Sequence, residues 1–423
     1  MSPRRPAVSS LRVATRLAIA GLVALPLACA SGTEHAGSPP PKVTPVASAA
    51  TAASTSAPTS APTSAPTSAP APVTTHTPAA PACHPEPLER LAAETLIVGL
   101  PDTVSPDDPL ALSAPALGVG GILLESANVQ SADQVRTLIS AVKTRRGGPL
   151  LVSTDEEGGR VTSFSSAIGW EASARSTSPL GPVALQQRAK ALGTALHNLG
   201  VTLDFAPDLD VTGGPDVAPI GDRSYSNDPA TASADALAVA RGLSEGGVTP
   251  VIKHFPGLGS ADANTDLASI VVNDPAWSLI YRDMRPFIDA INAGAPAVMV
   301  GHAQYPALGD PSLPASLSPV IYQKLRDIPF HGVTITDSLG AGAVNLRFDF
   351  PVAAVNALAA GVDGLLTTDA NQALRMRDAI VGAVQTHHLP AARVADAAAH
   401  VMALAGADPY PLTCVHVSLP KLH

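Results

Sequence analysis

The chain has 423 residues, and its 35 acidic residues outnumber its 26 lysines and arginines, for a formal net charge of −9. No basic run follows the first residues, so nucleic acid is disfavoured as a partner, because proteins that bind it carry clustered lysine and arginine. The residues show neither a metal-ligand spacing nor a cofactor motif. We therefore expect no metal ion and no organic cofactor.

Residues 1–30 have the composition of an export signal. Four arginines precede a short apolar run at residues 17–27, which is too short and too interrupted by proline for a membrane span. The run ends in Leu-Pro-Leu-Ala-Cys, which resembles a bacterial lipobox with Pro26 where leucine is usual, and this predicts lipidation of Cys29. Ordinary cleavage at Ala28-Cys29-Ala30 is the alternative. Both interpretations predict an exported protein, secreted or anchored to the cell membrane as a lipoprotein.

Residues 31–82 are rich in alanine, proline, serine and threonine, with Ser-Ala-Pro-Thr repeats between residues 55 and 70. Such a segment has little to bury, so it predicts a disordered tether without a catalytic role. A folded domain is expected over residues 83–415, followed by a tail at residues 416–423. Cys83 and Cys414 bracket this domain, and in an exported protein that placement predicts a disulfide.

Eight short apolar runs recur along this domain, with helix-like segments between them. The runs do not alternate apolar with polar residues, which is typical of strands covered on both faces. Strands are predicted at residues 95–100, 121–125, 149–154, 202–206, 248–253, 296–300, 332–336 and 361–366. Helices are predicted at residues 132–143, 185–199, 230–245, 276–293, 350–360, 372–384 and 391–404.

This alternation predicts an α/β fold, a single (β/α)8 TIM-type barrel. An open doubly wound sheet is the alternative. It is less favoured because no glycine-rich dinucleotide loop follows the first strand.

Charged and imidazole side chains follow five of the predicted strands, at the end where barrel enzymes have their active sites. They are the segment 155–161, Asp208, Asp210, Asp222, Arg223, Lys253, His254, His302 and Asp337. A single polar strand end is often only a helix cap, but five together form a constellation. Carboxylates with basic partners suit glycoside hydrolysis, in which one carboxylate attacks the anomeric carbon.

Several motifs resemble those of glycoside hydrolase family 3, and most of all its single-domain bacterial β-N-acetylglucosaminidases. They are Lys-His-Phe-Pro-Gly at 253–257, Asp-Glu-Glu-Gly-Gly-Arg-Val at 155–161, Phe-Ala-Pro-Asp-Leu-Asp-Val at 205–211, Ile-Thr-Asp-Ser-Leu at 335–339 and Val-Met-Val-Gly-His at 298–302. The resemblance spans residues 90–370, in the order that the family has.

The resemblance implies that Asp337 is the nucleophile of a retaining reaction and forms a covalent glycosyl-enzyme. A helix N-cap is the alternative role for this residue. The residues implied to hold the terminal sugar are Asp155, Arg223, Lys253, His254 and His302. For His302 a buried, hydrogen-bonded histidine is equally favoured.

Supporting roles are expected for the neighbouring charged residues. Asp222 is expected to support Arg223, and Asp210 to orient nearby loops. Turn and supporting positions are expected for Glu156, Glu157 and Arg160.

The loop after Gly259 departs from the family pattern. The β-N-acetylglucosaminidases have a histidine where this chain has Leu258, and an Asp-Ser-His acid/base triplet where it has Asn264-Thr265-Asp266. Asp266 is therefore the candidate acid/base, provided that burial raises its pKa, and Asp262 is a second candidate. If neither serves, the domain is catalytically weak or inactive.

The resemblance implies a retaining exo-β-glycosidase that removes terminal β-linked N-acetylglucosamine from cell-wall fragments or related glycans. The changed loop leaves two alternatives open, a β-glucosidase-like activity and a sugar-binding lipoprotein without activity. The expected partners are a carbohydrate and, through the lipid, a membrane, and a monomer is expected.

Overall fold

The structure is a computed structural model, and it describes residues 83–423. The predictions for residues 1–82, which include the signal, the tether and lipidation of Cys29, lie outside the described residues. Within residues 83–423, no helix combines the length and the hydropathy needed to cross a bilayer.

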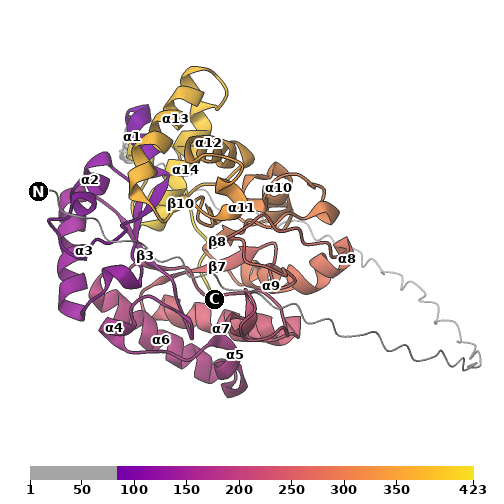
Figure 1. The fold of residues 1–423 in the computed structure, drawn as a ribbon. Helices are drawn as coiled ribbons and strands as arrows, with labels where there is room; N and C mark the ends of the chain where they lie inside the picture. The colour runs from indigo at the N-terminus through magenta and orange to yellow at the C-terminus, as the bar shows by residue number, and fades with distance from the viewer. Residues whose placement is uncertain (1–82) are drawn as a thin grey trace, which may run out of the picture. The chain divides into compact units, whose positions relative to one another are not determined.

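Eight parallel strands form one sheet in the order β10-β1-β2-β3-β6-β7-β8-β9. They are β1 (Leu96–Gly99), β2 (Gly121–Leu123), β3 (Leu151–Thr154), β6 (Leu203–Asp204), β7 (Thr249–Phe255), β8 (Ala297–Val300), β9 (Val333–Thr336) and β10 (Leu365–Thr367). A parallel bridge between Ile335 and Gly364 joins the β9 end to the β10 end, so the sheet closes on itself (Figure 1). The predicted TIM-type barrel is confirmed, and each predicted strand overlaps an observed one.

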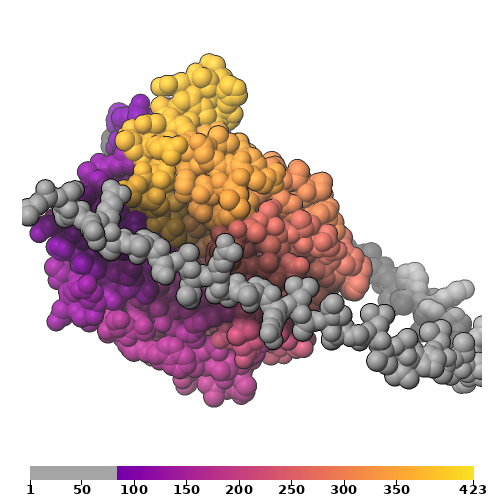
Figure 2. All heavy atoms as spheres, viewed as in Figure 1, coloured from indigo at the N-terminus to yellow at the C-terminus, as the bar shows by residue number. Residues whose placement is uncertain are grey.

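Helices cover the outside of the barrel. The longer ones are α1 (Leu88–Glu94), α2 (Pro109–Leu117), α3 (Ala132–Arg146), α6 (Pro182–Leu199), α7 (Pro229–Glu245), α9 (Arg285–Asn292), α10 (Pro319–Asp327), α12 (Phe350–Ala360), α13 (Ala373–Gln385) and α14 (Ala391–Leu404). Colour runs in chain order around the domain in Figure 2, so the yellow C-terminal helices meet the indigo N-terminal ones. This ring order is the one that a closed barrel requires.

Side chains at the helix starts explain several boundaries. Asp228 accepts a hydrogen bond from the Thr231 N–H at 2.9 Å, and Pro229 occupies the first turn of α7, where its missing N–H is no loss. The predicted helix at 276–293 is wrong as one element. It is divided into α8 (Ala276–Ser278), a π-helical turn at Leu279–Asp283 (η4) and α9, because Pro286 cannot donate to a preceding turn and begins a new helix.

Two large hydrophobic clusters form most of the core, and six of the eight barrel strands contribute to both, whereas β6 and β9 contribute only to the interior one. Ile97 faces the barrel interior, whereas its neighbours Leu96 and Val98 pack against the surrounding helices. Val401 and Leu404 of α14 belong to the interior cluster, and Leu419 packs against it. The C-terminal segment therefore covers apolar side chains inside the barrel, which is a larger role than that of the predicted tail.

Cys83 and Cys414 form a disulfide across a sequence separation of 331 residues, with their Cα atoms 5.3 Å apart. Main-chain hydrogen bonds lie beside it, since the His84 N–H donates to Pro411 O at 3.0 Å and the Glu86 N–H to Leu412 O at 2.9 Å. The first residues of the domain are thus tied to the short helix α15 (Tyr410–Thr413) by covalent and hydrogen bonds.

Candidate active site

A cavity of about 470 Å³ lies at the carboxyl ends of the strands. Six of the sequence-predicted site residues line it, namely Asp155, Arg223, Lys253, His254, Asp266 and Asp337. They come from the ends of strands β3, β7 and β9 and from the loops that follow β6 and β7. The closed barrel therefore brings together side chains that are up to 182 residues apart in the chain.

Lys253 lies at the centre of a buried charge network. Its Nζ atom is 2.5 Å from both Asp155 Oδ1 and Glu157 Oε1, and only 2% of its side chain is exposed. Burial alone favours the neutral amine, but Asp155 and Glu157 hold the pKa of Lys253 above its ordinary value. The lysine is therefore a permanent cation that fixes two carboxylates.

Arg223 makes a second set of contacts to the same network. Its Nε and Nη2 atoms donate to the two Glu157 oxygens at 2.7 and 2.8 Å, and Nη2 lies 3.3 Å from Asp208 Oδ2. Burial raises the pKa of Glu157, but Arg223 and Lys253 outweigh that effect and keep it below its usual range. This bidentate ion pair between Arg223 and Glu157 holds the guanidinium plane in one orientation.

The hairpin of β4 (Glu156–Gly158) and β5 (Val161–Thr162) explains why Glu157 takes part. Gly158 and Gly159 have φ angles of 84° and 63°, the left-handed region that favours glycine, and they make the turn. Glu157 faces the cavity while Glu156 is turned away from it, since successive strand residues point to opposite sides. Glu157 holds Lys253 and Arg223 in place, which agrees with the supporting position expected for it.

Asp222 differs from its predicted role of supporting Arg223. It pairs with Arg160 at 3.2 Å, whereas Glu157 and Asp208 support Arg223. Arg160 lines the cavity and donates to the carbonyl oxygens of Ala218, Pro219 and Ile220. This pair therefore ties the hairpin turn to the segment before η3 (Gly221–Arg223).

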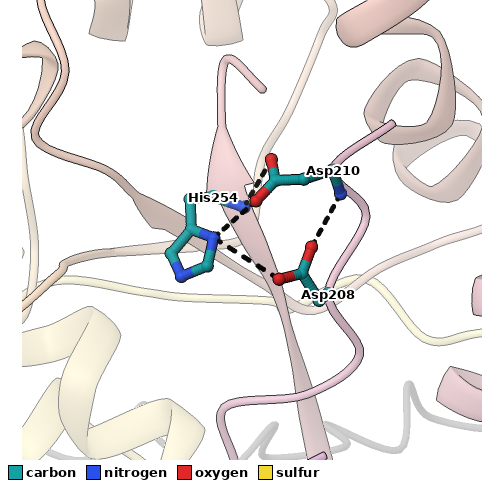
Figure 3. A group of neighbouring side chains, drawn as sticks. All are labelled: Asp208, Asp210 and His254. Carbon is teal, nitrogen blue, oxygen red and sulfur yellow. Dashed lines mark hydrogen bonds and ion pairs between the residues drawn. The ribbon is translucent and has the colours of Figure 1, made fainter. Parts of the chain in front are cut away.

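Asp210 holds His254 and the start of the following loop together (Figure 3). The His254 Nδ1–H donates to Asp210 Oδ2 at 2.7 Å, and the Leu258 N–H donates to Oδ1 at 2.6 Å. Burial lowers the pKa of His254, but Asp210 and Asp208 raise it further, so that the imidazolium is favoured. The predicted orienting role of Asp210 agrees with this geometry.

Asp208, Asp210 and His254 offer three potential ligand atoms within 4.8 Å of one another. Both Asp210 oxygens already accept N–H groups, and the Arg223 guanidinium lies 3.3 Å from Asp208 Oδ2, although that oxygen accepts no hydrogen bond. The hydrogen bond to Asp210 orients the His254 ring, which lines the cavity. His254 and Arg223 supply positive charge beside the two carboxyl groups, as a bound metal ion would.

Asp337 directly follows β9, and its main chain is held by a hydrogen bond from its N–H to Val300 O at 3.0 Å. Its Oδ1 atom accepts the Ser338 N–H at 2.6 Å. Burial raises its pKa, but His302 and His254 lower it more, so the pKa of Asp337 lies below its ordinary value. The cavity therefore presents an ionised carboxylate, which is the form that acts as a nucleophile.

His302 does not meet the expectation that it contacts substrate. Its side chain is fully buried and is not among the residues that line the cavity. Nδ1 lies 2.7 Å from Ser316 Oγ and Nε2 2.8 Å from Ser338 O, so both ring nitrogens already have partners. The ring supports the segment that carries Asp337, which is the buried alternative considered above.

The loop after Gly259 is tied to its surroundings at several points. The Gly342 and Ala343 N–H groups, in α11 (Gly342–Asn345), donate to the carbonyl oxygens of Asp266 and Thr265 at 2.8 and 3.0 Å. Asp266 lines the cavity, but the residue is exposed, so the expected burial of this candidate is not present. Asp262 is exposed and does not line the cavity, which removes the second acid/base candidate in this conformation.

Comparison with known proteins identifies the family. Residues 110–404 match the glycosyl hydrolase family 3 N-terminal domain. The chain belongs to glycoside hydrolase family 3. The chain is 36% identical over 359 residues to beta-hexosaminidase LpqI of Mycobacterium tuberculosis, covering 79% of this chain and 90% of the relative. It is 33% identical over 257 residues to a beta-hexosaminidase of Hydrogenovibrio crunogenus, covering 59% of this chain and 71% of the relative.

Solved structures of family 3 proteins have the same fold. A glycosyl hydrolase of Mycobacterium smegmatis superposes with a TM-score of 0.70 at 34% identity, covering 75% of this chain and 97% of its own. A β-N-acetylglucosaminidase of a Paenibacillus species superposes with a TM-score of 0.72 at 26% identity, covering 75% and 62%. This chain is therefore a glycoside hydrolase that acts on O-glycosyl bonds.

Near the site of this family 3 hydrolase, several carboxyl groups are buried without full hydrogen bonding, and Glu156 and Asp204 are two of them. Among the described residues, Glu156 Oε1 and Asp204 Oδ2 have no hydrogen-bond partner. Burial raises the pKa of Glu156 to about 7 and that of Asp204 well above its ordinary value. Both groups are accordingly held in their neutral form at a pH where exposed carboxyls are ionised.

We expect the stability from neutral Glu156 to be fully present below its unfolded pKa of 4.5 and to be lost as the pH rises to about 7. A rise of this size corresponds to about 3 kcal/mol. Glu156→Gln cannot ionise, so relative to wild type it gains stability as the pH rises from acidic to alkaline. Denaturant unfolding on both sides of this range measures the gain, with Glu89→Gln, at an exposed position of α1, as control. An equal pH dependence of wild type and Glu156→Gln would contradict the assignment.

Proposed function

We propose that this hydrolase removes terminal β-linked N-acetylglucosamine from glycans with retention of configuration. The ionised Asp337 carboxylate at the wall of the cavity, near the cationic groups of Lys253 and His254, is the observation that carries the proposal. The names of the relatives support the choice of sugar, since those compared above include beta-hexosaminidases and a β-N-acetylglucosaminidase. A cavity open at one end suits an enzyme that removes one terminal sugar at a time.

In the proposed reaction, Asp337 attacks the anomeric carbon and the bond to the leaving oxygen breaks, which gives a covalent glycosyl-enzyme. The leaving oxygen takes a proton from a general acid. A water molecule, deprotonated by the same group, then attacks the anomeric carbon and frees Asp337. Two inversions at one carbon restore the β configuration of the released sugar.

Four residues are proposed to bind the terminal sugar, namely Asp155, Arg223, Lys253 and His254. Their support is positional, because all four line the cavity that contains Asp337. The ion pair between Lys253 and Asp155, and the pairs of Lys253 and Arg223 with Glu157, fix these groups before the substrate arrives. Charged groups held in place bind hydroxyl groups without the cost of ordering them.

Asp266 is proposed as the proton donor, because it is the carboxyl group of the changed loop that lines the cavity. Asp266→Ala should lower kcat/KM for substrates with a poor leaving group by about 10²-fold or more, and for activated aryl glycosides far less, since only the former need protonation. Asp262→Ala, outside the cavity lining on the same loop, is the control. Equal losses on both kinds of substrate would refute the role of Asp266.

Export and lipid attachment at Cys29 are proposed from the sequence of residues 1–30. The tether at residues 31–82 would then hold the domain at a distance from the membrane, where cell-wall fragments are a plausible substrate. Mass spectrometry of the mature N-terminus tests this, because a lipid on Cys29 and an unmodified terminus after Ala30 differ in mass. Finding residues 1–30 intact on the mature protein would refute export.

Turnover of a chromogenic N-acetyl-β-glucosaminide, compared with the matching β-glucoside, tests the proposed activity. Preference for the N-acetyl substrate supports the proposal, and preference for the glucoside supports the β-glucosidase alternative. Sugar binding without turnover of either substrate, in a folded wild type, would show the non-catalytic alternative. Product anomers followed by NMR decide between retention and inversion.

A further inference from the structure

Glu125 is a cavity-lining carboxyl group that none of the motifs includes. It follows β2, so it stands at a strand end next to Asp155, which follows the neighbouring strand β3. Partial burial raises its pKa above the ordinary value, and the negative charge of Asp155 adds to the rise. The two carboxyl groups therefore share one part of the cavity wall.

The main chain of Glu125 is held in place from below. Its N–H donates to Asn128 Oδ1 at 2.8 Å, and the Asn128 amide donates to Leu100 O at 2.6 Å and Thr103 O at 2.9 Å. Asn128 is only 2% exposed, so these three hydrogen bonds are made by a buried side chain. Asn128 thus connects the main chain of Glu125 to Leu100, the residue after β1, and holds the Cα position of Glu125 at the cavity wall.

The cavity has more carboxyl groups than cations, and within residues 83–423 Glu125, Asp266 and Asp337 form no ion pair. Five carboxyl groups line it, against one lysine, two arginines and one histidine, so the wall carries an excess of negative charge. The cations are already paired, with Lys253 on Asp155 and Glu157, Arg223 on Glu157 and Arg160 on Asp222. Within residues 83–423, no lysine, arginine or histidine forms an ion pair with Glu125.

We propose that Glu125 determines which terminal sugars enter the site, by disfavouring anionic sugars and favouring neutral or amine-bearing ones. A sugar carboxylate would enter a cavity whose cations are compensated and would face Glu125, a carboxyl group at the exposed side of the cavity wall, without a counter-charge, so that like charges repel. A sugar ammonium group would instead meet a carboxylate that has no cation. This inference rests on the proposed function, because it defines the substrate class of the same cavity.

Binding of three monosaccharides at neutral pH tests it, with N-acetylglucosamine as the neutral ligand, glucosamine as the amine and glucuronic acid as the anion. The full folded protein and its Glu125→Gln, Glu125→Asp and Asp133→Asn variants are compared by ligand titration in NMR. Asp133 lies on the surface of α3 with 96% of its side chain exposed, which makes it a matched control for loss of one charge.

We expect Glu125→Gln to weaken glucosamine and strengthen glucuronic acid, each by about tenfold relative to N-acetylglucosamine, which corresponds to about 1.4 kcal/mol. Glu125→Asp should keep the wild-type order because it keeps the charge, and Asp133→Asn should change nothing. A purely structural role of Glu125 would shift all three ligands together. Affinity ratios that change by less than about twofold in Glu125→Gln, or no binding of any sugar, would overturn the inference.

Turnover measured on the same protein variants distinguishes a failure of this inference from a failure of the proposed function. Turnover of the N-acetyl-β-glucosaminide by wild type, combined with unchanged affinity ratios, would overturn only the role of Glu125. Absence of turnover combined with altered ratios would overturn the proposed activity and leave Glu125 as a determinant of sugar binding.

Discussion

Asp337→Asn is expected to lower kcat/KM for a chromogenic N-acetyl-β-glucosaminide by about 10⁴-fold or more, because the amide cannot form the glycosyl-enzyme. The substitution keeps the size of the side chain, and the asparagine oxygen can still accept the Ser338 N–H. Folding should therefore persist while the covalent step is lost. Steady-state kinetics together with intact-protein mass spectrometry in the presence of a slow substrate measure both effects.

Asp369→Asn is the matched control for this experiment. Asp369 is also an aspartate at the end of a strand, but it caps the 3-10 turn η7 (Ala370–Gln372) and does not line the cavity. Its replacement should leave activity within about twofold of wild type. An Asp337→Asn enzyme with more than about one tenth of the wild-type activity would rule out Asp337 as the nucleophile.

Lys253→Met is expected to destabilise the domain by about 3–5 kcal/mol and to abolish sugar binding at the same time. The methionine fills the space of the lysine stem but leaves Asp155 without its cation and Glu157 with Arg223 alone. A buried charge that loses its partner retains its desolvation cost, which is why the loss exceeds that of a surface ion pair. Denaturant unfolding at neutral pH measures the destabilisation.

Lys190→Met provides the comparison, because Lys190 pairs with Glu245 on the surface at 3.2 Å with about half of each side chain exposed. Its loss should cost less than about 1 kcal/mol. If both substitutions cost the same, Lys253 is not the centre of the charge network described above. If Lys253→Met is unstable but binds sugar normally, the lysine is structural only.

The barrel was predictable because its signal is local and repeated. Each strand is a short apolar run covered on both sides, so eight such runs separated by helical patterns left little choice of fold. Helices α12 and α14 have the predicted bounds, at Phe350–Ala360 and Ala391–Leu404. Lys253, His254 and Asp337 were located through motif resemblance joined to the rule that barrel sites lie at strand ends.

The parts of the site that sequence reasoning missed depend on side-chain direction. Glu156 and Glu157 are adjacent in the chain, but the short hairpin turns one into the core and the other to Lys253. The partner of Asp222 depends on where the hairpin turn places Arg160, which no local pattern encodes. Glu125 gave a usable signal, since it is the charged last residue of the second predicted strand, 121–125, and so stands at a strand end like the others.

The hydrogen bond at position 258 lets the loop residues after Gly259 change while the sugar-binding residue His254 stays in place. The Asp210 carboxylate accepts hydrogen bonds from the His254 ring and from the main-chain N–H of Leu258. The Leu258 side chain takes no part in this contact. Any residue with an N–H can therefore preserve the anchor, whereas proline would break it. Loop-exchange experiments that alter residues 259–266 can accordingly keep the histidine in place, provided that the exchange leaves a donor at 258.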